Sequence, residues 1–223
     1  MKGDKNLFQI IKTGYYSDLD NIERSPYGLK VYFGKMGSGK TLSMVRECYD
    51  LCQKYDDVAV ITNLSLNFKP KSNKYYFFTD MKSFISAYVS CIKMDKPKGV
   101  IVLIDEIHLF IQKLAMTKNL QLLTILSQVR KLNTYILGTT QLYNKVDKDI
   151  RDYIRTNGQI VFCSKRFYMT IHKYVNMDDC YENSKIELVY HIKKFDFFVH
   201  TQGLFSLYNT FDIISPVLDL LQS

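Results

Sequence analysis

The chain has 223 residues, 47% of them hydrophobic and 23% charged, which is typical of a globular domain and excludes a mainly disordered or low-complexity chain. No apolar run approaches the roughly 18 residues that cross a bilayer, and the N-terminus lacks the apolar core of a signal peptide. The net charge of +8 suits a polyanionic partner such as nucleic acid, although a lysine-rich soluble surface gives the same balance.

Predicted strands and helices alternate along the first two thirds of the chain. Apolar runs predict strands at 29–33, 58–64, 75–78, 100–104 and 134–140, and helical periodicity predicts helices at 40–55, 80–93, 119–131 and 147–154. Asp80 can cap the second helix. The last third changes to a period of two and predicts strands at 159–163, 168–175 and 185–192, with a turn at Asn183 and Ser184. This order predicts an α/β three-layer fold whose mostly parallel sheet is extended by antiparallel C-terminal strands.

A glycine-rich segment, GKMGSGKT at 34–41, follows the first strand and opens the first helix. It matches G-x-x-x-x-G-K-[ST], in which glycines turn backbone N–H groups toward a phosphate and the helix N-terminus adds partial positive charge. We expect the nucleotide to be bound by six residues of this loop: Gly34, Gly37, Ser38, Gly39, Lys40 and Thr41. Lys40 would reach the β- and γ-phosphates, and the Thr41 hydroxyl would be a Mg²⁺ ligand.

An acidic pair, Asp105 and Glu106, ends the apolar strand at 100–104. A carboxylate at this position can hold the Mg²⁺ shell, and we assign that role to Asp105. Glu106 is then placed to polarise the attacking water as a general base. His108 is either a neighbour of the site or a capping or packing residue.

Polar and cationic residues surround the next strand. Gln141, at its end, is our candidate for contacting the γ-phosphate or the water, although a strand-end polar residue is an alternative. Arg130 precedes the strand, and Arg151 and Arg155 lie four apart on the following helix. An arginine supplied by a neighbouring subunit would stabilise charge in the transition state. Surface cations are an equally good reading of each one.

Four stretches carry a family resemblance: GKMGSGKT, VIVLIDEIHLF, VRKLNTYILGTTQ and LFSLYNTFDII. In this order and spacing they resemble the FtsK–HerA superfamily of DNA-pumping ATPases, and within it the viral genome-packaging ATPases and the zonula occludens toxin-like proteins that assemble filamentous phage. The resemblance covers 28–165 and 207–210, where relatives carry a Tyr-Asp-Thr-like segment. It implies a P-loop NTPase with a RecA/HerA-like sheet, ATP and Mg²⁺ as cofactors, and a hexameric ring with DNA in the pore and Arg130 as a candidate trans finger.

These expectations divide the chain into an N-terminal extension at 1–27 and a P-loop ATPase domain at 28–223. The toxin-like proteins continue into a transmembrane segment and this chain ends without one, so we favour an ATP-driven motor that packages double-stranded DNA into a capsid. It would act in the host cytoplasm or on the virion, docked on a capsid or portal protein. The five cysteines, without a CxxC pair, fit this reducing compartment.

Two other functions stay open. The first is a toxin-like ATPase that drives virion assembly or extrusion. The second is a GTP-dependent switch, because residues 144–147 spell N-K-x-D, although the acidic strand continues as Glu106-Ile107-His108 and not as D-x-x-G.

Two clusters outside the nucleotide motifs are candidate nucleic-acid contacts, each with a structural alternative. The lysines of the 67–74 loop could grip phosphates, but a solvated loop is the simpler reading: Lys69, Lys71 and Lys74. The C-terminal aromatic residues could stack bases, but strand core or a subunit interface is the simpler reading: Phe195, Phe197 and Phe198.

Overall fold

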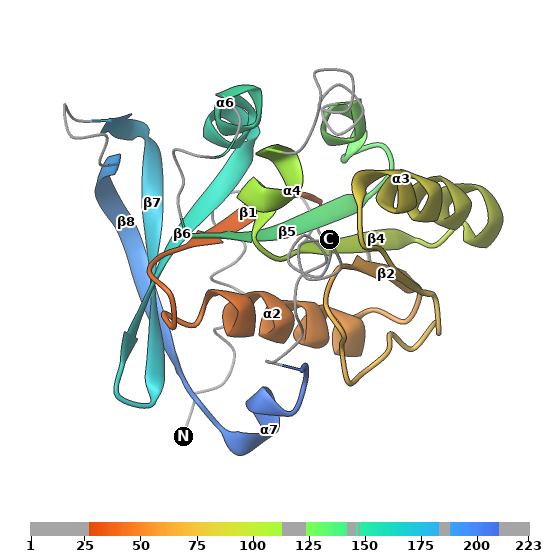
Figure 1. The fold of residues 1–223 in the computed structure, drawn as a ribbon, viewed down its shortest axis with the longest axis horizontal. Helices are drawn as coiled ribbons and strands as arrows, with labels where there is room; N and C mark the ends of the chain where they lie inside the picture. The colour runs from red at the N-terminus through yellow and green to blue at the C-terminus, as the bar shows by residue number, and fades with distance from the viewer. Residues whose placement is uncertain (1–26, 113–123, 142–145, 147, 183–187, 210–223) are drawn as a thin grey trace, which may run out of the picture.

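The computed structural model describes residues 27–112, 124–141, 146, 148–182 and 188–209 (Figure 1). Their strands form one eight-stranded sheet in the order β3-β2-β4-β5-β1-β6-β7-β8. The strands from β3 to β6 in this order run parallel, and β7 and β8 are antiparallel to their neighbours. The strands are β1 (Gly28–Phe33), β2 (Val58–Thr62), β3 (Tyr75–Phe77), β4 (Gly99–Ile104), β5 (Thr134–Thr140), β6 (Gly158–Arg166), β7 (Met169–Glu182) and β8 (Leu188–Val199). The predicted α/β architecture is confirmed.

Helices cover both faces of the parallel part of the sheet. They are α2 (Lys40–Lys54), α3 (Met81–Ser90), α4 (Ile107–Gln112), α6 (Lys148–Asn157) and α7 (Gln202–Phe205), and a π-helical turn at Cys91–Asp95 extends α3. Figure 1 shows α2 on one face and α3, α4 and α6 on the other. Each face packs its own apolar cluster against the sheet, so β1, β4 and β5 are buried along their whole length. Strands buried on both faces explain the continuous apolar runs in the sequence.

Several predicted boundaries change in the structure. Asp80 caps α3 as expected, accepting a hydrogen bond from the Ser83 N–H at 2.8 Å. The helix α4, directly after the acidic pair, was not predicted, and only 124–128 of the expected 119–131 helix are described as helical. β7 and β8 are longer than expected because pairing with each other continues their ladder beyond the alternating sequence pattern. The expected turn at Asn183 and Ser184, and nearly all of the expected N-terminal extension, lie outside the described residues.

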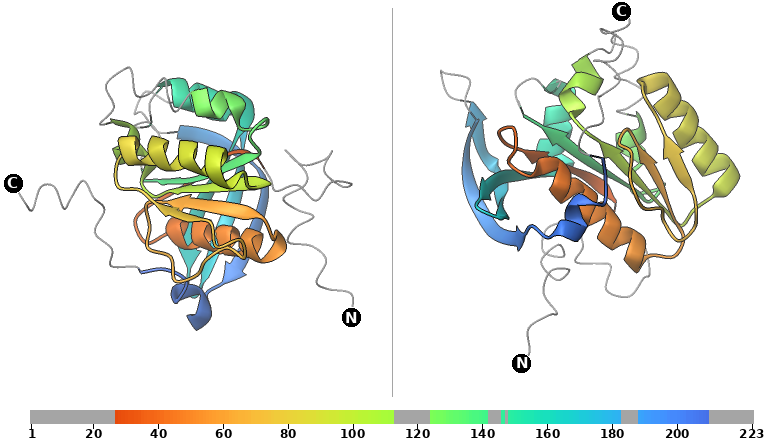
Figure 2. Two further views of the ribbon diagram at one scale, coloured as in Figure 1. Left: turned by 90° about the vertical axis from the view of Figure 1, so that its right-hand side faces the viewer. Right: turned by 60° about the horizontal axis from the view of Figure 1, so that its bottom comes forward.

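Parallel pairing decides where the functional residues meet. β1, β4 and β5 are paired in the order β4-β5-β1, so their carboxyl ends lie at one edge of the sheet. The glycine-rich loop, the acidic pair and Gln141 follow these three ends. Beyond β8, α7 packs against α2, as the right-hand view of Figure 2 shows. Among the described helices, none has the length and hydropathy needed to cross a membrane.

Candidate nucleotide site

The loop between β1 and α2 has the backbone of a phosphate cradle. Gly37 and Gly39 have φ values of 71° and 89°, in the left-handed region that favours glycine. A side chain at Gly34 would collide with the Cys163 carbonyl, and one at Gly39 would collide with the Thr170 side chain. The loop therefore packs tightly against β6 and β7, and only glycine fits at these two positions.

Lys40 and Thr41 begin α2 at the open side of this loop. Lys40 is 6% exposed and its Nζ donates to the Lys35 carbonyl at 3.1 Å, so the ammonium lies across the loop. The Thr41 hydroxyl donates to Asp105 Oδ1 at 2.9 Å. This bond joins the glycine-rich loop to the acidic strand end, two motifs that are far apart in the sequence.

Asp105 is fixed by three neighbours. Its Oδ1 accepts a second hydrogen bond, from the Thr139 hydroxyl at 2.6 Å. The side-chain amide of Asn63, directly after β2, forms two hydrogen bonds with the Asp105 backbone. The Asp105 N–H donates to Asn63 Oδ1 at 2.8 Å, and Asn63 Nδ2 donates to the Asp105 carbonyl at 3.1 Å. Burial raises the pKa of the Asp105 carboxyl above its usual range, although the bonds from Thr139 and Thr41 oppose this rise. Sequence reasoning missed both Asn63 and Thr139.

Glu106 is held in an unusual conformation beside Asp105. Its φ of 51° is rare for a non-glycine residue. Its N–H donates to Thr139 Oγ1 at 2.9 Å, and its carboxylate accepts from Gln141 Nε2 at 2.7 Å and lies 3.2 Å from His108 Nδ1. Burial alone would raise the Glu106 pKa, but the contacts with His108 and Gln141 outweigh it, and the pKa lies below its usual range. Gln141 thus contacts the carboxylate of the candidate base.

His108 connects this carboxylate to β5. It is buried in α4, and its Nδ1 also lies 3.1 Å from the Thr140 hydroxyl. Of the two readings left open by the sequence, the structure therefore supports a neighbour of the site. His108 lies next to Glu106 Oε2 and Gln141 donates to Oε1, so each carboxylate oxygen has its own neighbour.

The loop and the acidic end fit a magnesium nucleotide. The Ser38 hydroxyl is buried and has no hydrogen-bond partner among the described residues. A bound anion would supply the missing hydrogen-bond acceptor. Hydroxyl and carboxylate oxygens, as supplied by Thr41 and Asp105, are the ligands that Mg²⁺ prefers. The α/β sheet, the loop with its positive-φ glycines and the acidic strand end are together the features of a P-loop NTPase fold.

The candidate trans finger, Arg130, does not lie at this site. It is exposed and precedes β5, whereas the phosphate loop lies at the carboxyl edge of the sheet. A strand of seven residues, such as β5, spans about 23 Å, so Arg130 cannot reach the site of its own chain. The Arg155 side chain and three of the four N-K-x-D residues lie outside the described residues: Asn144, Lys145 and Asp147.

The segment after β8 crosses to the acidic end of the site. Tyr208 pairs with Leu66 as an isolated antiparallel bridge, and the Asn67 N–H donates to the Leu207 carbonyl at 2.8 Å. Burial, together with the Asp105 charge, raises the pKa of Tyr208 to about 12. This places the expected Tyr-Asp-Thr-like segment next to the acidic pair, although Thr210 lies outside the described residues.

The structure shows different surroundings for the two candidate nucleic-acid clusters. Lys71 forms an ion pair with Asp56 at 2.8 Å and Lys74 one with Asp57 at 2.7 Å, so these two lysines are already paired. Phe198 is buried, as the strand-core reading predicts. Its neighbours Phe195 and Phe197 are exposed on the other face of β8.

Comparison with known proteins shows the family of this chain. A protein-family model described as zonular occludens toxin (Zot) matches residues 29–200. The chain is also similar to the crystal structure of the N-terminal domain of zonular occludens toxin from Neisseria meningitidis, with 18% identity and a TM-score of 0.53 over 83% of this chain and 100% of that one.

More distant likenesses have lower scores. The flagellar accessory protein FlaH from Methanocaldococcus jannaschii is 14% identical, with a TM-score of 0.45 over 75% of this chain and 91% of that one. A solved structure described as an ATPase domain is 16% identical, with a TM-score of 0.44 over 66% of this chain and 76% of that one. No curated protein sequence matches the chain significantly. The family match spans both the phosphate loop and the acidic pair, and on this ground the chain belongs to the zonular occludens toxin (Zot) family.

Proposed function

We propose that the chain is an ATP-hydrolysing enzyme whose turnover drives virion assembly or extrusion. The observation that carries the proposal is the 2.9 Å hydrogen bond between Thr41 and Asp105, which brings the phosphate loop and the acidic strand end into one site. The sequence favoured genome packaging, but membership of the Zot family supports the assembly alternative more strongly. A role in moving DNA remains the second candidate, supported by the net charge of +8.

The residues of the site divide the chemistry among them. The loop from Gly34 to Thr41 binds the phosphates through its N–H groups, and Lys40 turns from the Lys35 carbonyl to them. Thr41 and Asp105 would hold Mg²⁺, which supplies charge neutralisation for the phosphates.

Glu106 takes a proton from the attacking water, which adds to the γ-phosphorus as the bond to the β-γ bridging oxygen breaks. Its lowered pKa keeps it ionised at neutral pH. Gln141 and His108 hold the carboxylate in place. Further charge stabilisation would come from Arg130 of a second copy in a ring, since it lies far from the site of its own chain.

The test is hydrolysis of ATP and GTP by the purified chain with Mg²⁺, with and without double-stranded DNA. Lys40→Ala should reduce turnover by about 10²–10³-fold or more, because it removes charge stabilisation from the transition state. Lys82→Ala, which removes an exposed lysine from α3, is the matched control and should leave turnover unchanged.

The arms of the test separate the candidates. ATP turnover that is lost in Lys40→Ala and indifferent to DNA supports the assembly role. Turnover that rises with DNA supports a translocase, and a clear GTP preference would favour the switch. Wild-type protein without turnover at concentrations where it self-associates would contradict the proposal.

A further inference from the structure

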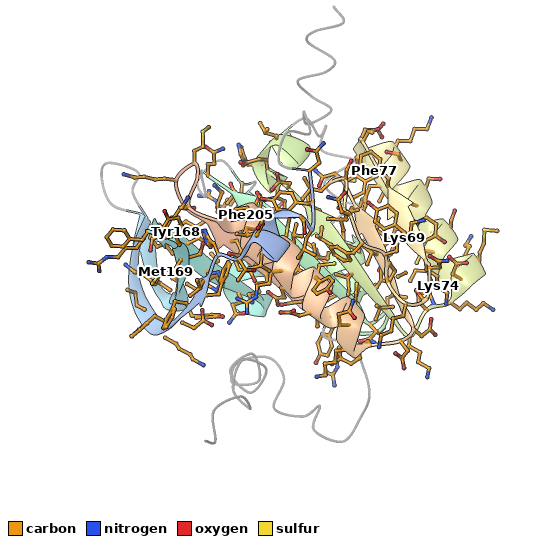
Figure 3. All side chains as sticks on the ribbon, turned by 90° about the horizontal axis from the view of Figure 1, so that it is seen from below. Lys69, Lys74, Phe77, Tyr168, Met169 and Phe205 are labelled. Atoms are coloured by element: carbon orange, nitrogen blue, oxygen red, sulfur yellow. The ribbon has the colours of Figure 1, made fainter. Side chains whose placement is uncertain are left out.

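Two exposed aromatic side chains lie beside the phosphate loop, away from the acidic pair. Tyr168 belongs to the turn between β6 and β7 and is 80% exposed, and Phe205 ends α7 and is 45% exposed. Figure 3 labels both residues, at neighbouring positions in the view from below. Isolated exposed aromatic residues are ordinary on a protein surface, but two that are held by the same histidine beside one loop suggest a ligand.

A chain of contacts ties this pair to the last glycine of the loop. Gly39 packs against Thr170, and the Thr170 hydroxyl lies 2.7 Å from His200 Nε2. The His200 ring meets the Phe205 ring edge-on, with centroids 5.5 Å apart. The His200 backbone N–H donates to the Tyr168 backbone carbonyl at 2.6 Å. Both aromatic residues are thus held at the end of the loop where α2 begins.

The strand order indicates which part of a bound nucleotide would reach Tyr168 and Phe205. The acidic pair lies on β4, which is separated from β1 by β5, and β6 flanks β1 on its other side. Glu106 acts at the terminal phosphate, so that end of the triphosphate points toward β4. The sugar and base then extend in the opposite direction, toward the ends of β6 and β7, where Tyr168 and Phe205 lie.

The turn that carries Tyr168 is unusual in its residue types. Arg166 pairs with Met169, which leaves Phe167 and Tyr168 as a two-residue hairpin loop. Such loops prefer residues such as Asn and Gly, because their backbone needs positive φ. Here Phe167 has a φ of 53°. Aromatic residues in this position indicate that their side chains have a use beyond closing the hairpin.

We propose that Tyr168 and Phe205 form the subsite for the base of the bound nucleotide, which their rings contact by stacking. This rests on the proposed nucleotide hydrolysis at the same site. Aromatic stacking suits a base because every base presents a flat π-face. His200, bonded to Thr170 and packed on Phe205, is a positioning residue for the subsite.

The test compares two ligands that share the loop but not the base. Affinities for Mg·ATP and for Mg·tripolyphosphate are measured by calorimetry with the full chain. Tyr168→Ala should weaken ATP binding by about fivefold to a hundredfold, the range of a lost stacking contact. Its affinity for tripolyphosphate should be unchanged, which also shows that the variant is folded. Phe205→Ala should act in the same direction, and Tyr168→Phe should bind ATP like the wild type.

Phe195→Ala is the matched control, because Phe195 is 70% exposed on the outer face of β8 and should affect neither ligand. Unchanged ATP affinity in both alanine variants, with tripolyphosphate still bound, would overturn the base subsite and leave the phosphate site standing. The same result with lost self-association would assign the two rings to a subunit contact. Wild-type protein that binds neither ligand would overturn the proposed function itself.

Discussion

Two polar clusters meet α2, one at its N-terminus and one along its flank, and they are built differently. At the N-terminus, Thr41 and Asp105 are joined, yet the Ser38 hydroxyl has no partner among the described residues. On the flank, the buried Glu47 carboxylate accepts hydrogen bonds from Lys30 Nζ at 2.8 Å, from the Tyr135 hydroxyl at 2.7 Å and from the Tyr32 hydroxyl. The first cluster keeps bonding capacity for a ligand, and the second uses it within the fold.

The flank cluster continues into the antiparallel hairpin. His172 on β7 lies 2.8 Å from the Ser43 hydroxyl on α2 and 3.0 Å from Asp196 on β8, and Tyr174 donates to Asp196 at 3.0 Å. Ser, His and Asp in this order resemble a nucleophilic triad. However, Ser43 is 2% exposed and its hydroxyl donates to the Gly39 carbonyl at 2.7 Å.

This cluster therefore connects the helix to the sheet. A cavity of about 50 Å³ lies within it, between α2 and the hairpin. A buried carboxylate beside α2 can therefore serve stability or chemistry, depending on whether the chain itself supplies hydrogen-bond partners to the groups around it.

The largest effect is expected for Glu106→Gln. Removing the base should lower kcat by about 10²–10⁴-fold, while the free energy of unfolding and the affinity for ATP change little. Steady-state hydrolysis and calorimetry give the two readings. Asp56→Asn is the control, since its 86% exposed side chain pairs only at the surface. A Glu106→Gln protein with normal turnover would remove Glu106 from the chemistry.

Glu47→Gln should show the opposite pattern. It leaves the buried Lys30 ammonium without its counter-charge, so the free energy of unfolding should fall by about 3–5 kcal/mol in urea denaturation. Turnover per folded molecule should be unchanged. Asp50→Asn is the control and should cost less than about 0.5 kcal/mol, because Asp50 is half-exposed and lies 3.8 Å from Arg46.

The pH dependence tests the same assignment. Burial alone would raise the Glu47 pKa, but Lys30 and the two tyrosines outweigh it, and the folded pKa lies below the unfolded value. Glu47 therefore stabilises the fold above its unfolded pKa of about 4.3, and this contribution is lost as the pH falls through the folded pKa. The wild type should lose stability more steeply than Glu47→Gln in this acid range. Parallel curves for the two proteins would contradict the assignment.

The smallest effect is expected for Asp105→Asn, and it is a gain in stability. Burial raises the Asp105 pKa, so the ionised carboxylate opposes folding at neutral pH in the nucleotide-free protein. Replacing it should add about 0.5–2 kcal/mol to the free energy of unfolding, while Asn Oδ1 still accepts from Thr41 and Thr139. Thermal melts should show the gain without ligand and a reduced response to Mg·ATP. A less stable variant would show that the charge supports the fold.

The sequence predicted local chemistry better than contacts between distant segments. Lys40, Thr41, Asp105 and Glu106 could be proposed because strand–loop–helix and strand–acid patterns are contiguous. That Gln141 reaches the phosphate or the water stays a prediction, and the sequence did not indicate its 2.7 Å hydrogen bond to Glu106. Such a contact depends on how β5 lies beside β4, which no local pattern contains.

The phosphate loop, the buried parallel strands and the family resemblance could all be identified from the amino-acid sequence, because each depends on residues close together in the chain. The roles of Asn63, Thr139 and His172 became visible only in the folded protein. Their side chains carry no motif, and they gain partners only when strands distant in sequence are paired in the sheet. The same pairing turns Gly39 toward Thr170, and so places the aromatic turn of the hairpin beside the phosphate loop.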